Sequence, residues 1–148
     1  MKTHKDGTLP HGQPNTVFVY GSNLRGIHGA GAALAAHTHF GAKLGIGSAV
    51  LVGRSFGIPT KYNPTMNQRD RIPLFSISAA IKQLADTMRD NPNLTFFLTR
   101  VGCGLAGYRD GDVAPLFAEQ LEGLYDQLDV PETWAPYFKE RARASYGS

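Results

Sequence analysis

Short apolar runs separated by glycine-rich loops mark the strands expected in this chain. TVFVY (16–20) and LTFFLTRV (94–101) are rich in β-branched and aromatic residues, which is typical of strands buried on both faces of a sheet. SAVLVG (48–53) and SFGIP (55–59) predict a strand pair joined at Gly53 and Arg54. We therefore expect a sheet built largely from buried strands.

Helical patterns fall between these runs. LFSISAAIKQLADTMRD (74–90) carries one apolar stripe at three- and four-residue steps, starts after Pro73 and ends at DNPN. The members of the stripe are Leu74, Ile77, Ile81, Leu84 and Met88. AGAALAAHTHF (30–40) predicts a second helix, whose alanines allow a close approach to a sheet.

The two ends of the chain give weaker patterns. Residues 1–15 are polar, contain glycine and proline, and predict a flexible arm. DVAPLFAEQLEGLYDQL (112–128) predicts a helix in which Pro115 either precedes the regular part or lies in the first turn. PETWAPYFKERARASY (131–146) predicts a last short helix. We expect an arm over 1–15, a domain over 16–128 and a helical tail over 129–148 packed on that domain.

The alternation of strands and helices predicts the α/β class with a parallel or mixed sheet. In such sheets, ligands bind where loops leave the carboxyl ends of the strands. Both glycine-rich loops of this chain follow predicted strands, so we expect them to form the binding site.

Composition and charge narrow the class of protein. A chain of 148 residues with 42% hydrophobic and 18% charged residues fits one soluble globular domain. We expect a cytoplasmic protein, because it shows neither an apolar run of membrane-spanning length nor a signal peptide. The formal charge is +7 over residues 1–110 (12 Lys and Arg, 5 Asp and Glu) and −4 over 111–148 (3 and 7). A basic body suits an anionic ligand, although a solvated basic surface explains the same balance.

The first candidate site is the loop GSNLRGIHGAGAA (21–33). Glycines let backbone amides approach a ligand, and a helix that begins near Ala30 directs its amino end toward an anion such as phosphate. A tight turn before a closely packed helix explains the same residues equally well. The candidate ligand-binding residues are Gly21, Ser22, Asn23, His28, Gly29, Ala30 and Gly31.

The second candidate site is TRVGCGLAGYRDGD (99–112), which contains the only cysteine of the chain. Glycines again follow a strand, so this loop can face the first one across a diphosphate. No base can be assigned to Cys103, which we interpret as a small packing residue. The candidate ligand-binding residues are Gly102, Cys103, Gly104, Leu105, Ala106, Gly107 and Tyr108, where Tyr108 either forms a wall for a sugar or base or packs over the loop.

The third candidate site is IPTK (58–61), where Thr60 and Lys61 end a strand near the same crevice. A lysine becomes a nucleophile only when its pKa is lowered, and an ordinary surface lysine is the alternative. His37 and His39 lie two residues apart and make a poor metal pair, so we expect no metal site and no cofactor.

Three stretches together resemble the macrodomain superfamily: SNLRGIHGAGAALAAHTHFG, IPTK with IPLFSISAAIKQL, and LTFFLTRVGCGLAGY. The closest subgroup contains the terminal ADP-ribose glycohydrolase and the antitoxin that removes ADP-ribose from DNA; small phage and bacterial macro-like proteins are also similar. The resemblance covers roughly residues 16–117. It implies a three-layer α/β/α sandwich that binds ADP-ribose or a related nucleotide, with the pyrophosphate between the two glycine loops and Asn23 near the distal ribose.

The resemblance also implies a role for Lys61, which matches the subgroup's lysine nucleophile. The substrate would then be an ADP-ribosylated protein or nucleic acid. The subgroup's acidic residue after Gly-Cys-Gly-Leu is replaced here by Ala106, and Asp110 or Asp112 could substitute for it. The residues after 128 lack the pattern of the family's last strand.

Three functions stay open from the sequence. The first is hydrolysis of ADP-ribosyl linkages, with Lys61 and Asp112 as candidate catalytic residues. The second is a binder without turnover that sequesters ADP-ribose-related or cyclic nucleotide signals. The third is an interaction module that uses the aromatic tail, whose alternative is an aromatic cluster folded onto its own core. The sequence leaves the oligomeric state undetermined.

Overall fold

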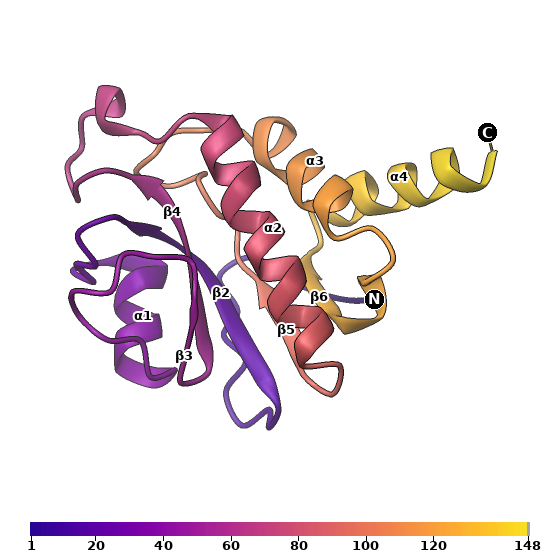
Figure 1. The fold of residues 1–148 in the computed structure, drawn as a ribbon, viewed down its shortest axis with the longest axis horizontal. Coiled ribbons are helices and arrows are strands. Elements are labelled where there is room, and N and C mark those ends of the chain that lie inside the picture. Colours follow the sequence, from indigo (N-terminus) through magenta and orange to yellow (C-terminus); the bar gives the residue numbers. More distant parts are fainter. Residues whose placement is uncertain (148) are drawn as a thin grey trace.

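Six strands form one mixed sheet in the order β1-β6-β5-β2-β4-β3 (Figure 1). This computed structural model describes residues 1–147, and side chains over residues 1–144. Neighbouring strands run parallel except β3 and β4, which are antiparallel. The strands are β1 (Lys2–His4), β2 (Thr16–Asn23), β3 (Leu51–Val52), β4 (Ser55–Lys61), β5 (Thr95–Leu98) and β6 (Leu128–Pro131). The predicted α/β class and mixed sheet are confirmed.

Helices cover both faces of this sheet, which confirms the three-layer architecture. On one face, α1 packs against aromatic residues of the central strands through Ala36 and Phe40, with Phe18 and Phe97 opposite. On the other face, α2 and α3 cover a larger apolar core, and α4 packs beside α3 (Figure 1). The helices are α1 (Gly31–His39), α2 (Leu74–Asp90), α3 (Asp110–Gln120) and α4 (Ala135–Gly147), with 3₁₀ turns at Gln68–Asp70 and Tyr125–Gln127.

The strongest sequence pattern gives the best agreement with the structure. α2 covers residues Leu74–Asp90, as its apolar stripe predicts. Ile77, Ile81 and Met88 are fully buried on the face toward the sheet. Pro73 lies just before the first turn, where its fixed φ and missing N–H cost the helix nothing.

The expectation of a flexible arm over residues 1–15 is wrong for its first residues. β1 pairs with β6 at the edge of the sheet. His4 stacks on Phe97 with ring centroids 3.7 Å apart, and its Nδ1 lies 2.7 Å from Oδ1 of Asp129. These contacts join residues far apart in sequence, and a three-residue polar strand has no local pattern that would reveal them.

The expected boundary at residue 128 is also corrected. β6 pairs in parallel with β5 and is buried along its whole length, so the sheet continues past residue 128. The expected 112–128 helix begins earlier, at Asp110, and ends at Gln120 with Pro115 inside it. Gly123, in the turn that follows the helix, adopts a positive φ of 85°, which favours glycine at that position.

The aromatic residues of the tail belong to the main core. Trp134 and Phe138 are fully buried, and Tyr137 packs against them at the edge of the cluster. Trp134 lies 5.3 Å from Phe117 between ring centroids. The hypothesis of an interaction module that presents these aromatic residues to a partner is therefore wrong. The alternative, an aromatic cluster folded onto the core, is confirmed.

Candidate functional site

A cavity of about 1010 Å³ opens where β2, β4 and β5 end. Its walls come from the loops that follow these three parallel strands and from the segment after β1. The cavity is large enough for a dinucleotide-sized ligand. Among the candidate residues from the sequence, the structure brings together Gly21, Ser22, Asn23, Gly29, Ala30, Gly31, Thr60, Lys61, Gly102, Cys103, Gly104, Leu105 and Ala106.

Gly21, near the end of β2, lies against the backbone of the second glycine loop. A Cβ added to Gly21 would lie 3.4 Å from the amide nitrogen of Gly102 and 3.5 Å from Oγ1 of Thr60. Gly102 has a φ of 80°, which favours glycine at that position. The Thr60 hydroxyl donates to the Ser22 carbonyl over 3.3 Å, which ties β4 to β2 at this point.

The loop after β2 is held in shape by Asn23. Its Oδ1 accepts a hydrogen bond from the Ile27 amide over 3.1 Å, and its Nδ2 donates to the Ile27 carbonyl over 2.9 Å. Asn23 thus uses both ends of its amide to close the loop, although it lines the cavity. Ser22 also lines the cavity, and among the described residues its buried hydroxyl has no hydrogen-bond partner.

The amino end of α1 faces this cavity without a side-chain cap. Ala30 precedes the helix in extended conformation and offers no capping oxygen, and the first turn contains no acidic residue. Gly31, Ala32 and Ala33 line the cavity. Because the first amides of a helix lack intrahelical acceptors, they can donate to an anion in the cavity.

Lys61 lines the cavity at the end of β4 and is only 3% exposed. Its Nζ donates to the carbonyl oxygens of Thr65 over 2.6 Å and of Asn67 over 2.7 Å. Carbonyl acceptors stabilise the charged ammonium, whereas a nucleophilic amine must be neutral. In this arrangement the Lys61 Nζ is a hydrogen-bond donor to its own loop.

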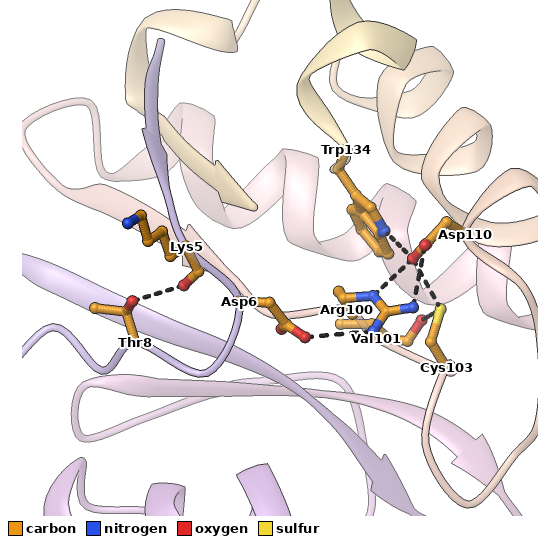
Figure 2. Close-up of polar contacts among 8 residues, drawn as sticks. All are labelled: Lys5, Asp6, Thr8, Arg100, Val101, Cys103, Asp110 and Trp134. Atoms are coloured by element: carbon orange, nitrogen blue, oxygen red, sulfur yellow. Dashed lines mark hydrogen bonds and ion pairs between the residues drawn. The ribbon is translucent and has the colours of Figure 1, made fainter. Parts of the chain in front are cut away.

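Arg100 connects the cavity wall to three distant segments (Figure 2). Its Nε and Nη2 donate to the two carboxylate oxygens of Asp110 over 2.8 and 3.0 Å, and its Nη1 contacts Asp6 over 3.3 Å. The Trp134 indole donates to the same Asp110 over 2.6 Å. Hydrogen bonds from Arg100 and Trp134 hold the pKa of Asp110 below its usual value, although burial alone would raise it. The loop that carries Gly102 and Gly104 is thus anchored from behind.

Cys103 lies beside this anchor. Its Sγ is 3.5 Å from Oδ1 of Asp110 and 3.7 Å from the Val101 carbonyl (Figure 2). Burial and the neighbouring Asp110 carboxylate raise the pKa of the Cys103 thiol to about 12. A neutral thiol is a poor nucleophile, which agrees with its interpretation as a packing residue.

His28 does not line the cavity, although it belongs to the first glycine loop. It is buried beneath α1, and its Nε2 lies 3.0 Å from the hydroxyl of Tyr20. Burial and the nearby His37 lower the pKa of His28, and these effects outweigh a backbone hydrogen bond with Gly26 that would raise it. Its neutral ring serves the packing between α1 and the sheet.

Three further candidate residues, Gly107, Tyr108 and Asp112, do not line the cavity. The Tyr108 hydroxyl donates to the Ile72 carbonyl over 2.7 Å, and Gly107 lies against Gln68. Asp112 accepts from the amide of Arg109 over 2.9 Å and closes the capping box of α3. The structure therefore gives Tyr108 and Asp112 the structural roles of packing and capping.

Several cavity residues have no counterpart among the sequence candidates. The end of β1 contributes His4, the segment after it contributes Asp6, Thr8 and Leu9, and the loop after β5 contributes Arg100. The hydroxyl of Thr8 donates to the Lys5 carbonyl over 2.6 Å and closes a turn at the cavity (Figure 2). Only long-range contacts place this segment, so no local sequence pattern could have identified it.

The described residues offer neither a membrane span nor a metal centre. Across residues 1–147, no helix is long and apolar enough to cross a bilayer. The same part of the chain contains no group of three or more His, Cys, Asp or Glu side chains arranged to hold a metal ion.

Comparisons with known proteins identify the fold. No protein-family model and no curated protein matches the sequence. Two macrodomains match the structure with a TM-score of 0.64 over 88% of this chain: that of Thermus aquaticus DarG (20% identity, 97% of its chain) and that of Mycobacterium tuberculosis DarG (21%, 95%). A Bacteroides thetaiotaomicron protein of unknown function matches with a TM-score of 0.67 and 18% identity, over 88% of this chain and 96% of that one. This chain has the macrodomain fold.

Proposed function

We propose that the protein binds ADP-ribose, free or attached to a protein or nucleic acid, in the cavity at the ends of β2, β4 and β5. The observation that carries this proposal is the close approach of Gly21, near the end of β2, to Gly102 in the loop after β5, where both line the cavity. The uncapped amino end of α1 supplies amide donors for a diphosphate on one side. Lys61 and Arg100 supply positive charge, and Asp6 is the cavity's only carboxylate among the described residues.

Isothermal titration with ADP-ribose tests this proposal. Nothing lies within 4 Å of a Cβ added to Gly104 or to Gly29, and neither residue has a positive φ. We expect Gly104→Val and Gly29→Val to leave the melting temperature within about 2 °C and to weaken ADP-ribose binding at least tenfold, because the added side chain takes ligand space. Ala79→Val, on the exposed face of α2, is the matched control and should bind as the wild type does.

The absence of a melting-temperature shift at millimolar ADP-ribose would contradict the proposal, since any ligand selective for the native state raises that temperature. Titration with cyclic nucleotides in parallel distinguishes ADP-ribose from related nucleotide signals.

Turnover is a second candidate function, favoured by the position of Lys61 in the cavity wall. In that reaction the neutral Lys61 amine attacks the anomeric carbon of the distal ribose while the glycosidic bond opens and the acceptor leaves with the bonding electrons. Water then releases ADP-ribose and restores the amine. Ala106 in the wall provides no carboxylate for the second step. Binding without turnover therefore fits the observed residues better.

Release of ADP-ribose from ADP-ribosylated peptide and single-stranded DNA measures turnover directly. If turnover occurs through Lys61, Lys61→Met abolishes release and keeps at least part of the binding. Release that persists in Lys61→Met would remove Lys61 from the chemistry, and no release by the wild type would leave the protein as a binder.

A further inference from the structure

The amine of Lys61 is enclosed by the segment that directly follows it. After β4 ends, residues 62–67 loop back so that the carbonyl oxygens of Thr65 and Asn67 both face Nζ, at 2.6 and 2.7 Å. Pro64 and Met66 of the same loop line the cavity, and Met66 is 81% exposed. The loop thus forms part of the cavity wall and also binds the lysine.

Asp70 closes this loop from outside the cavity. Its Oδ1 accepts from the Asn63 side chain over 3.1 Å, and its Oδ2 accepts from the Thr65 hydroxyl over 2.9 Å. Its own carbonyl accepts from the amide of Tyr62 over 2.9 Å. One residue therefore fixes the start and the middle of the loop, and with them the carbonyl of Thr65.

The charges of the two residues are coupled. Burial alone would raise the pKa of Asp70, but hydrogen bonds from Thr65 and Asn63 together with the positive charge of Lys61 lower it. Asp70 is thus a carboxylate at neutral pH. The carboxylate therefore both shapes the loop and lies within electrostatic reach of Lys61.

We propose that Asp70 is a positioning residue for Lys61: through the loop 62–67, it holds the Lys61 amine in place as an ammonium donor. Loosening the loop removes these hydrogen bonds and exposes the amine to reagents in solution. The consequence for ligand binding rests on the proposed function, whereas the consequence for the reactivity of the amine does not.

Competitive trace acetylation with acetic anhydride tests the proposal without any ligand. Peptide mass spectrometry gives the rate at Lys61 relative to Lys82, which is exposed on α2 and serves as the internal standard. In the wild type we expect Lys61 to react at least tenfold more slowly than Lys82. Asp70→Ala should raise the relative rate at Lys61 at least fivefold, and Asp70→Asn should give an intermediate value because one acceptor oxygen remains.

Asp86→Ala is the matched control, because Asp86 is an exposed carboxylate on α2 whose ion pair is with Arg89, away from Lys61. It should leave the relative rate at Lys61 unchanged. A rate at Lys61 in folded Asp70→Asn and Asp70→Ala equal to that of the wild type would overturn the proposal. Circular dichroism establishes that each variant is folded, and Asp70→Asn keeps the test valid where Asp70→Ala is unfolded.

ADP-ribose titration of the same variants separates the two proposals. If both hold, Asp70→Ala weakens binding by a factor similar to that of Lys61→Met, and the double variant weakens it no further, because both changes remove the same donor. Additive losses would contradict the positioning role. A wild type that does not bind ADP-ribose contradicts the proposed function alone, and the acetylation rates still decide the role of Asp70.

Discussion

Asp110 satisfies three side chains with one carboxylate. It accepts hydrogen bonds from the Arg100 guanidinium, the Trp134 indole and the Cys103 thiol. Arg100 and Cys103 belong to the loop in the cavity wall, and Trp134 lies just before α4. A partly buried carboxylate is stable here because each oxygen has at least one donor. The Arg100–Asp110 contact also has the two parallel hydrogen bonds that make such pairs directional. This single residue therefore fixes the loop that carries Gly102 and Gly104.

The reactivity of Cys103 follows from the same neighbourhood. With the pKa of the thiol raised to about 12 by burial and by the Asp110 carboxylate, little thiolate exists at pH 8. We expect native Cys103 to react with iodoacetamide at least about 100-fold more slowly than a free thiol of ordinary pKa. The protein in guanidinium chloride is the control and should react at the ordinary rate. Rapid alkylation of the native protein would contradict the interpretation of Cys103 as a packing residue.

At the scale of elements, a sequence pattern predicts a helix or strand when the residues that stabilise it lie within the element itself. The stripe from Leu74 to Met88 predicts α2 because helical periodicity alone decides which side chains are buried. β1 and β6 escape prediction because each is short and depends on neighbours far along the chain. A sequence pattern cannot supply such non-local contacts.

The candidate site divides in the same way. Glycines after strands predict the two loops, because the carboxyl ends of parallel strands meet at one edge of a sheet. The sequence does not say which side of a loop each residue faces. His28 and Tyr108 therefore lie outside the cavity lining, whereas Asp6 enters the site from a segment 94 positions before Arg100.

β1 illustrates how a short element can matter to stability. His4 contacts Asp129 and Phe97, and the side chains of His4 and Asp129 are 8% and 7% exposed. We expect His4→Ala to lower the free energy of unfolding by about 2–4 kcal/mol, because the change leaves the Asp129 carboxylate buried without this partner.

Urea denaturation measures this effect. His39→Ala, at an exposed position near the end of α1, is the matched control and should change the free energy of unfolding by less than about 0.5 kcal/mol. An equally small change for His4→Ala would show that β1 adds no stability.

At the scale of the molecule, the site and its support occupy different parts of the chain. Every residue that lines the cavity lies between His4 and Ala106, within the part that carries the positive charge balance. α3, α4 and the turn before α4 supply core residues such as Phe117, Phe138 and Trp134. Residues 1–110, which carry the net positive charge, thus surround the cavity, as suits an anionic ligand. Residues 111–148, which carry the net negative charge, contribute to the core that supports it.

This division has a spectroscopic consequence. Trp134 is the only tryptophan in the sequence, and its indole is fully buried and donates to Asp110. Asp110 in turn holds Arg100 in the cavity wall. The tryptophan fluorescence of the native protein therefore comes from one indole, which Asp110 and Arg100 connect to the cavity. A ligand that displaces Arg100 changes the electrostatic field at that indole, so the protein reports occupancy of its cavity without an added dye.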